Sequence, residues 1–451
     1  MLDLTDIQGN ILRGYRFPVV RYTFVTINST EEGRLWLNEI RDQVTTAEDW
    51  GAVPPRSTLN IAFTYAGLSA LELNQESLDS FPAEFRQGAL ARAESLGDRD
   101  ESGPVHWDDG LGTSDRYVLI HAMFVIYAVD FSSLDERHNM VLSLIPGDGV
   151  RVIYTQDAGQ LADGMEHFGF RDDISQPPIL GGNIAEYPGH GIRQPDGSWR
   201  ALATGEFLLG QPAQDGAVAS SPSPEVLRWN GTYLVYRKLH QKVAHFRQYL
   251  KQSASALSWD EELLAARIVG RWRDGTPTMR SPNQKDPALA NDPMANNDFS
   301  FSDDPKGLRC PLGAHVRRSN PRDALPGGAA AVEGHRMLRR GMPYGPALLS
   351  SMPDDGVDRG LVFIAVISNI RSQFEFVQQQ WKNSGGFAGL DPAQKDLFVG
   401  DNDGTGVMVI PMADFPRRIF GITRFVVVRL SLYLFMPGIQ ALRFLSEVSD
   451  D

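Results

Sequence analysis

The chain has 451 residues, of which 42% are hydrophobic and 22% charged, which is typical of a globular protein large enough for two domains. It carries 43 basic and 56 acidic residues, a formal net charge of −13, which argues against a nucleic acid-binding groove and against adsorption to anionic membranes. Its single cysteine, Cys310, excludes an internal disulfide and a cysteine-rich metal site, so histidines and carboxylates remain as possible metal ligands.

The first residues do not have the pattern of a targeting segment. Two acidic side chains, Asp3 and Asp6, occur where a secretory signal would need a basic start and an apolar run. No stretch reaches the roughly 18 apolar residues of a membrane span. The default expectation is therefore a cytoplasmic protein with no membrane partner, and export by a non-classical route stays open.

Strand and helix patterns alternate along the chain. Segments rich in β-branched and aromatic residues predict strands in the first half at 21–27, 59–65, 117–126 and 150–154. Helical patterns lie between them at 33–44 and 82–96. The second half repeats this character, with predicted strands at 361–367, 407–412 and 425–435 and predicted helices at 232–252, 258–271 and 370–383.

The strand patterns indicate the fold class. They alternate or are aromatic rather than uniformly aliphatic, which favours antiparallel α+β layers over a doubly wound parallel sheet. Residues 211–224 are rich in Pro, Ser, Gly and Ala and are the predicted domain boundary. We therefore expect an N-terminal domain over 1–220 and a C-terminal domain over 221–451.

Among the nine histidines, His315 has the most suggestive neighbours. The small residues Gly313 and Ala314 precede it, which lets a bulky group approach the backbone. Three arginines follow within seven residues, including Arg318 and Arg322, and could bind the carboxylates of a cofactor. The residues alone leave a purely structural histidine as the more common alternative.

Two further segments carry candidate chemical groups. Asp172 and Asp173 lie in a loop flanked by aromatic residues and Pro177, where an Asx turn or a helix cap is the more common explanation. Arg339 and Arg340 precede a Gly-Met-Pro-Tyr-Gly turn, and they could equally be surface charges on a hairpin. Each segment by itself is a weak signal.

Together, in this order and at these separations, the three segments resemble the dye-decolorizing peroxidase family. Its distal motif, Gly-x-x-Asp-Gly, is matched by residues 169–173 except that Asp173 replaces the last glycine. Its proximal histidine segment is matched by 314–322, and its distal arginine segment by 339–345. Similarity elsewhere covers 6–15, 230–238, 360–363 and 378–381, and the length is that of one of the larger branches.

The resemblance implies two ferredoxin-like domains with antiparallel sheets and peripheral helices, similar to a dimeric α+β barrel. It implies one haem b per chain in the C-terminal domain, with His315 as the iron ligand. Leu361 and Phe363 would line the distal side of the haem. Arg318 and Arg322 are the candidates to bind its propionates.

The same resemblance assigns the chemistry. Asp172 would take a proton from hydrogen peroxide and return it to the departing oxygen, and Arg339 would stabilise the charge that develops there. The other ring nitrogen of His315 should meet a carboxylate or a carbonyl oxygen, and Asp401 and Asp403 are candidates by rough position.

The implied activity is the reduction of hydrogen peroxide coupled to one-electron oxidation of dyes, phenolics or similar small reductants. The reductant itself stays open between a dye, a phenol, a lignin fragment and manganese, and the chain could be a monomer or a homo-oligomer. Trp381 and Tyr344 are candidate relays for electrons from bulky substrates, with ordinary packing as the alternative.

Three other functions compete with this interpretation. A protein that carries haem or releases its iron would need neither Asp172 nor Arg339, so their presence argues against it. A chlorite dismutase-like enzyme would lack the distal aspartate motif. A binding module without haem would show no Soret band.

Asp173 is the departure from the family pattern. Glycine at this position would permit a positive φ, and aspartate is among the few other residues that tolerate it, so we expect the turn to survive. Two adjacent acids resist ionising together. We expect Asp172 to remain the main acid–base group and Asp173 to shift the pH optimum or shape peroxide access. The alternative is that Asp173 points at the haem and shares the role.

Overall fold

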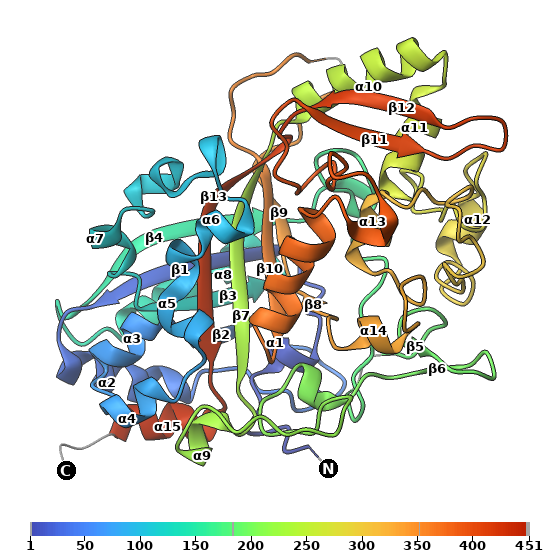
Figure 1. The fold of residues 1–451 in the computed structure, drawn as a ribbon. Helices are drawn as coiled ribbons and strands as arrows, with labels where there is room; N and C mark the ends of the chain where they lie inside the picture. The colour runs from blue at the N-terminus through green and yellow to red at the C-terminus, as the bar shows by residue number, and fades with distance from the viewer. Residues whose placement is uncertain (1, 183–184, 351, 448–451) are drawn as a thin grey trace.

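The computed structural model describes residues 2–182, 185–350 and 352–447. Its main sheet is formed by β1 (Val19–Ile27), β2 (Ser57–Phe63), β3 (Ala122–Ala128), β4 (Val150–Gly159), β7 (Thr232–Gln241), β8 (Leu338–Arg339), β9 (Met342–Tyr344), β10 (Gly360–Ile367) and β13 (Val426–Met436). The strand order is β4-β1-β3-β2-β13-β7-β10-β8, with β9 also paired to β10. All these pairings are antiparallel, which confirms the predicted α+β class (Figure 1).

The sheet consists of two groups of strands from the two halves of the sequence. Strands β1 to β4 come from the first half, and β7 to β10 with β13 come from the second. The two groups meet where β2 lies beside β13, with Phe63 opposite Phe435. The predicted boundary at 211–224 lies in the connection between them, and the division at residue 220 stays a prediction.

Helices cover the sheet at its periphery. Those of the first half are α1 (Gly9–Leu12), α2 (Thr30–Arg41), α3 (Tyr65–Ala70), α4 (Gln75–Asp79), α5 (Ala83–Ala91), α6 (Ala93–Leu96), α7 (Ser114–Tyr117) and α8 (Phe131–Ser143). Those of the second half are α9 (Glu225–Arg228), α10 (Val243–Leu257), α11 (Glu261–Val269), α12 (Pro287–Asn291), α13 (His315–Ser319), α14 (Ala330–Glu333) and α15 (Ile439–Glu447). No helix in the described ranges combines the length and apolar character needed to cross a bilayer.

Local sequence explains why the longer helices form where they do. Ser29 begins α2 and accepts the N–H of Glu32, while Asp260 caps α11 in the same manner. Helix α2 buries Trp36 and Leu37 against one face of the sheet. The opposite face carries the second large hydrophobic core, so the sheet is buried on both sides.

One predicted helix is wrong. Residues 232–252 were expected to be helical, but their first ten residues form β7, a central strand between β13 and β10. The helix α10 begins only at Val243. The segment Thr-Tyr-Leu-Val-Tyr is rich in β-branched and aromatic residues, and burial on both faces removes the alternation that would have identified a strand.

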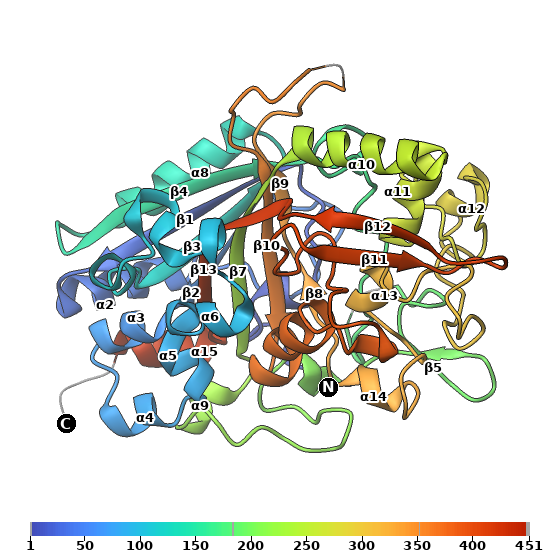
Figure 2. The ribbon, with the colours of Figure 1, turned by 45° about the horizontal axis from the view of Figure 1, so that its top comes forward.

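The helix expected at 370–383 is present but has π geometry, in the segments η6 (Arg371–Glu375) and η7 (Val377–Lys382). Such wider turns are rare and are often found beside functional sites. Two short hairpins, β5 (Ile192–Arg193) with β6 (Trp199–Arg200) and β11 (Gly406–Ile410) with β12 (Arg417–Ile422), lie outside the main sheet. Hairpin β11–β12 lies near α10, α11 and α13 on one side of the molecule (Figure 2).

Candidate active site

His315 is the first residue of α13, and its two ring nitrogens have different surroundings. Nδ1 lies 2.9 and 3.0 Å from the two carboxylate oxygens of Asp396. Nε2 makes no hydrogen bond to any of the described residues, and the side chain is 31% exposed while that of Asp396 is fully buried. The ring is therefore held from one side and presents Nε2 as a free ligand atom on the other.

Electrostatics favour the neutral form of this ring. Burial lowers the pKa of His315, and the positive charges of Lys382 and Arg339 act in the same direction, while Asp396 opposes them. Burial alone would raise the pKa of Asp396, but the charges of His315 and Lys382 outweigh it and hold that pKa well below its ordinary value. A neutral imidazole that donates Nδ1–H to a carboxylate is the arrangement that suits a metal-ligating histidine.

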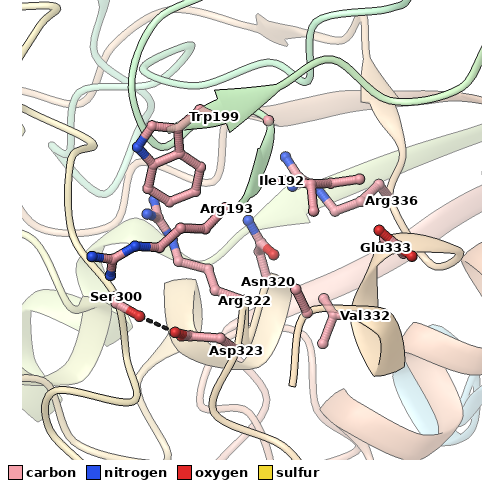
Figure 3. Close-up of a pocket in the computed structure, with 12 residues that line it drawn as sticks. Ile192, Arg193, Trp199, Ser300, Asn320, Arg322, Asp323, Val332, Glu333 and Arg336 are labelled. Carbon is pink, nitrogen blue, oxygen red and sulfur yellow. Dashed lines mark hydrogen bonds between the residues drawn. The ribbon is translucent and has the colours of Figure 1, made fainter. Parts of the chain in front are cut away.

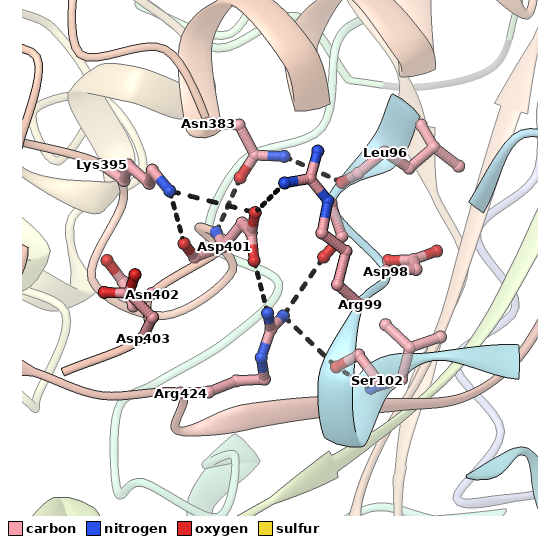
Figure 4. A network of polar contacts seen from close by, with 12 residues as sticks. Leu96, Asp98, Arg99, Ser102, Asn383, Lys395, Asp401, Asn402, Asp403 and Arg424 are labelled. Atoms are coloured by element: carbon pink, nitrogen blue, oxygen red, sulfur yellow. Dashed lines mark hydrogen bonds and ion pairs between the residues drawn. The ribbon is translucent and has the colours of Figure 1, made fainter. Parts of the chain in front are cut away.

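The carboxylate partner predicted from the sequence is wrong. Asp401 instead pairs with Arg424 and lies 3.7 Å from Arg99, and its own N–H donates to Asn383 at 2.7 Å (Figure 4). Asp403 accepts two hydrogen bonds from Thr405 in a local turn.

Asp396 is the partner because its loop, 81 residues further along the chain, brings its carboxylate to Nδ1 of His315. Its Oδ1 accepts the N–H groups of Phe398 and Val399, which fixes its orientation. The only local signal for this residue is an acid placed directly before the apolar pair Leu397-Phe398.

The predicted distal residues Asp172 and Asp173 follow a small hairpin. Met165 pairs with Arg171, and the N–H of Asp172 donates to the carbonyl of Gly164 at 2.9 Å. Asp172 is exposed, and its carboxylate accepts the N–H of Asp173 at 2.7 Å. Asp173 has a φ of 52°, so the left-handed turn expected from the motif glycine is confirmed with aspartate in its place.

Glu166 shapes this hairpin and was not identified from the sequence. Its carboxylate accepts the N–H groups of Phe168 and Phe170, each at 2.9 Å, and the side-chain amide of Gln241 on β7 at 2.7 Å. The hairpin before Asp172 is thus attached to the C-terminal strands.

Truncation of Glu166 should therefore destabilise the protein. In Glu166→Ala, three donors lose their acceptor, and each buried unsatisfied donor costs about 1–3 kcal/mol. We expect the free energy of unfolding, measured by urea denaturation, to fall by at least the cost of one such donor, about 1–3 kcal/mol. Glu262→Ala is the matched control, because it removes only a half-exposed ion pair with Arg273 and should cost less than about 1 kcal/mol.

An aromatic cluster connects the distal hairpin with the histidine. The ring of Phe398 lies 5.2 Å from that of Phe168 and 5.4 Å from the imidazole of His315, centroid to centroid. Phe246 of α10 completes the cluster, 4.8 Å from Phe168. The segment that carries the predicted proximal ligand and the hairpin that carries the predicted distal acid are therefore packed together through these rings.

Arg339 lies beside the distal loop. Its guanidinium donates to the carbonyl of Ser175 at 2.9 Å, and its N–H donates to the side chain of Gln176 at 3.0 Å. On β8 it is opposite Ala365 of β10, and residues 361, 363 and 365 of that strand share a face. Leu361 and Phe363 are half-exposed although β10 is an inner strand. The structure thus places an apolar surface next to Arg339.

Four arginines of the candidate site, Arg339 among them, have no carboxylate partner within the described residues. Arg271, Arg322, Arg336 and Arg339 form no ion pair within the described residues, and their hydrogen bonds go to carbonyl and side-chain amide oxygens. Burial and neighbouring guanidinium groups lower the pKa of Arg322 to about 9 and of Arg336 to about 10. An uncompensated cluster of this kind is suited to an anionic group.

Arg322 and Arg336 both line a small open pocket between the β5–β6 hairpin and α14 (Figure 3). Arg336 was not among the predicted cofactor-binding residues. Arg318 has a different environment from the one expected, because its buried guanidinium donates to the carbonyls of Trp381, Ser384 and Gln394. We assign Arg318 to holding α13 in place.

The two candidate relay residues are both buried. Trp381 is 4% exposed and packs edge-on against His335 and Phe376. Tyr344 is 3% exposed and donates its hydroxyl to Asp358 at 2.9 Å. Their role in electron transfer stays a prediction.

Comparison with known proteins decides the family. The model described as DyP dimeric alpha+beta barrel domain matches residues 6–160, and that described as Dyp-type peroxidase, C-terminal matches 219–388. Peroxidase 2 of Mycetinis scorodonius is 32% identical over 98% of this chain and 87% of its own. The chain belongs to the dye-decolorizing peroxidase family.

Other members agree with this assignment. Dye-decolorizing peroxidase AauDyP1 of Auricularia auricula-judae is 31% identical over 98% of this chain and 86% of its own. The crystal structure of a fungal DyP-type peroxidase from the same organism covers 99% of both chains with a TM-score of 0.84 at 27% identity. An ancestral D-type dye decolorizing peroxidase covers 98% of both chains with a TM-score of 0.83 at 30% identity. As a family member, this chain is an oxidoreductase that acts on hydrogen peroxide.

Proposed function

We propose that the chain binds one haem b through His315 and uses it to reduce hydrogen peroxide while oxidising dyes, phenolics or similar small reductants. The observation that carries this proposal is the free Nε2 of a carboxylate-bound histidine. Phe398 packs against both this ring and Phe168 of the hairpin before Asp172, and Arg339 donates to the carbonyl of Ser175 in the Asp172 loop. The positive charge of Arg339 also helps to lower the pKa of His315.

The residues present fit a haem. Leu361 and Phe363 offer apolar contact for the ring, and the uncompensated guanidinium groups of Arg322 and Arg336 suit its two propionates. Bound there, haem would supply a redox centre that takes oxidising equivalents from peroxide and passes them on as single electrons.

The protein supplies the acid–base and electrostatic chemistry. Asp172 accepts a proton from hydrogen peroxide and delivers it to the departing oxygen. The guanidinium of Arg339 donates to the carbonyl of Ser175, and the backbone N–H of the same residue donates to the side chain of Gln176. The charge is therefore already oriented toward the negative charge that develops there. Asp396 keeps the His315 ring in one orientation and one tautomer.

The reductant class is supported by relatives. Curated relatives are called dye-decolorizing peroxidases, and one solved family member is in complex with 2,6-dimethoxyphenol. We extend both substrate classes, dyes and small phenols, to this chain. A cytoplasmic location and a monomeric or homo-oligomeric state stay predictions.

The test is spectroscopic. Purified protein should show a Soret band with one haem per chain, and peroxide should change that spectrum and drive oxidation of a reducing dye. A Soret band without dye or phenol oxidation would favour a haem carrier instead, while protein that takes up no haem would refute the proposal.

The two adjacent acids can be distinguished by substitution. We expect Asp172→Asn to slow the reaction with peroxide strongly, because the acid–base group is lost. We expect Asp173→Gly and Asp173→Asn to keep the reaction and to shift its pH optimum, since the left-handed turn suits glycine and asparagine. Stopped-flow rates against pH would show this, and the assignment would be reversed if Asp173→Asn were crippled while Asp172→Asn was nearly normal.

A further inference from the structure

A buried lysine shares the carboxylate that binds His315. Lys382, the last residue of η7, has a side chain that is only 6% exposed. Its Nζ donates to Asp396 Oδ2 at 3.0 Å and to the Ser319 hydroxyl at 2.6 Å. It also donates to the carbonyl of His315 at 3.1 Å and lies 3.4 Å from Nδ1 of the same residue.

This arrangement places two donors on one carboxylate oxygen. Asp396 Oδ2 is 2.9 Å from Nδ1 of His315 and 3.0 Å from Nζ of Lys382. A carboxylate that accepts Nδ1–H makes the imidazole a stronger electron donor to a metal, which favours the oxidised state of that metal. An ammonium on the same oxygen withdraws part of that negative charge, so it weakens this effect.

We propose that Lys382 is a positioning residue that raises the reduction potential of the haem iron by sharing Asp396 Oδ2 with His315. The inference rests on the proposed binding of haem by His315. Direct repulsion between the ammonium and the iron charge acts in the same direction, because it disfavours the more highly charged oxidised iron. Lys382 and Asp396 therefore shift the reduction potential of the iron in opposite directions.

The local contacts indicate that Lys382 can be replaced without loss of the site. Ser319 Oγ already donates to the carbonyl of His315 at 2.6 Å. Asp396 retains His315 and the N–H groups of Phe398 and Val399 as donors. Lys382→Met keeps the length of the side chain without the charge, and Lys382→Gln also keeps a neutral donor.

The test is spectroelectrochemical titration of the haem-loaded protein and its variants. Burial lowers the pKa of Lys382 to about 8, so about pH 6 is a condition at which the ammonium is charged. We expect both lysine variants to have lower potentials, with the oxidised-to-reduced equilibrium moved roughly tenfold, which is about 59 mV for one electron. The iron–histidine stretching frequency of the reduced protein should rise in both.

Two further variants give the controls. Asp396→Asn should move the potential in the opposite direction, because it removes the negative charge. Lys395→Met should leave it unchanged, because the Nζ of Lys395 contacts the carbonyl of Asp401 instead.

The inference is overturned if either lysine variant has a potential equal to or above that of the unaltered protein. Loss of haem from both would also overturn it, since Lys382 would then be structural. If the unaltered protein binds no haem, the proposed function fails instead. If Asp396→Asn shifts the potential and the lysine variants do not, only the role of Lys382 is refuted.

Discussion

His315→Ala is expected to abolish stable haem binding. The imidazole Nε2 is the free ligand atom that the site presents, and its loss would leave the iron without its only protein bond. The apolar contacts of Leu361 and Phe363 would remain, but they do not hold the metal. The measurement is the Soret absorbance and haem content of the purified variant, which should fall to near the background level.

Two controls separate ligation from folding. His106→Ala removes an exposed histidine at the end of a short 3-10 helix and should keep full haem content. His315→Gly with added imidazole should regain a Soret band, because the free base can occupy the space of the missing ring beside Asp396. A normal Soret band and full haem content in His315→Ala would show that the iron ligand lies elsewhere.

Arg339→Leu should leave haem bound but slow the reaction with hydrogen peroxide by roughly 100- to 1000-fold. The guanidinium is oriented in advance by the carbonyl of Ser175, and Gln176 binds the backbone N–H of the same residue, so the charge is available without reorganisation when the oxygen–oxygen bond breaks. The second-order rate constant from stopped-flow mixing is the relevant quantity.

The matched control is Arg418→Leu, the same substitution at an exposed arginine of β12, which should react at the normal rate. Arg339→Lys should recover only part of the rate, because an ammonium lacks the planar fork of donors. Unchanged kinetics in Arg339→Leu would exclude this residue and direct attention to Arg336 and Arg340.

Local patterns in the sequence were sufficient for the fold class and for the three functional segments. Runs rich in β-branched and aromatic residues identified β1, β10 and β13, because such side chains favour strands. The turn at Asp173 was also predictable, because a positive φ depends on the residue itself. His315, Asp172 and Arg339 were selected as site residues because each lies within a short contiguous motif, and their roles stay predictions.

Tertiary structure alone decided the partners of those residues. Asp396 is 81 positions from His315 and Lys382 is 67, so no local spacing relates them. The same holds for Glu166, which reaches Gln241 across 75 residues, and for Arg318, whose three carbonyl acceptors lie 63 to 76 residues away. Strand β7 was misread for a related reason, since burial on both faces erased its alternation. Backbone conformation follows from nearby residues, whereas the charge and hydrogen bonding of a buried site depend on which distant segments pack together.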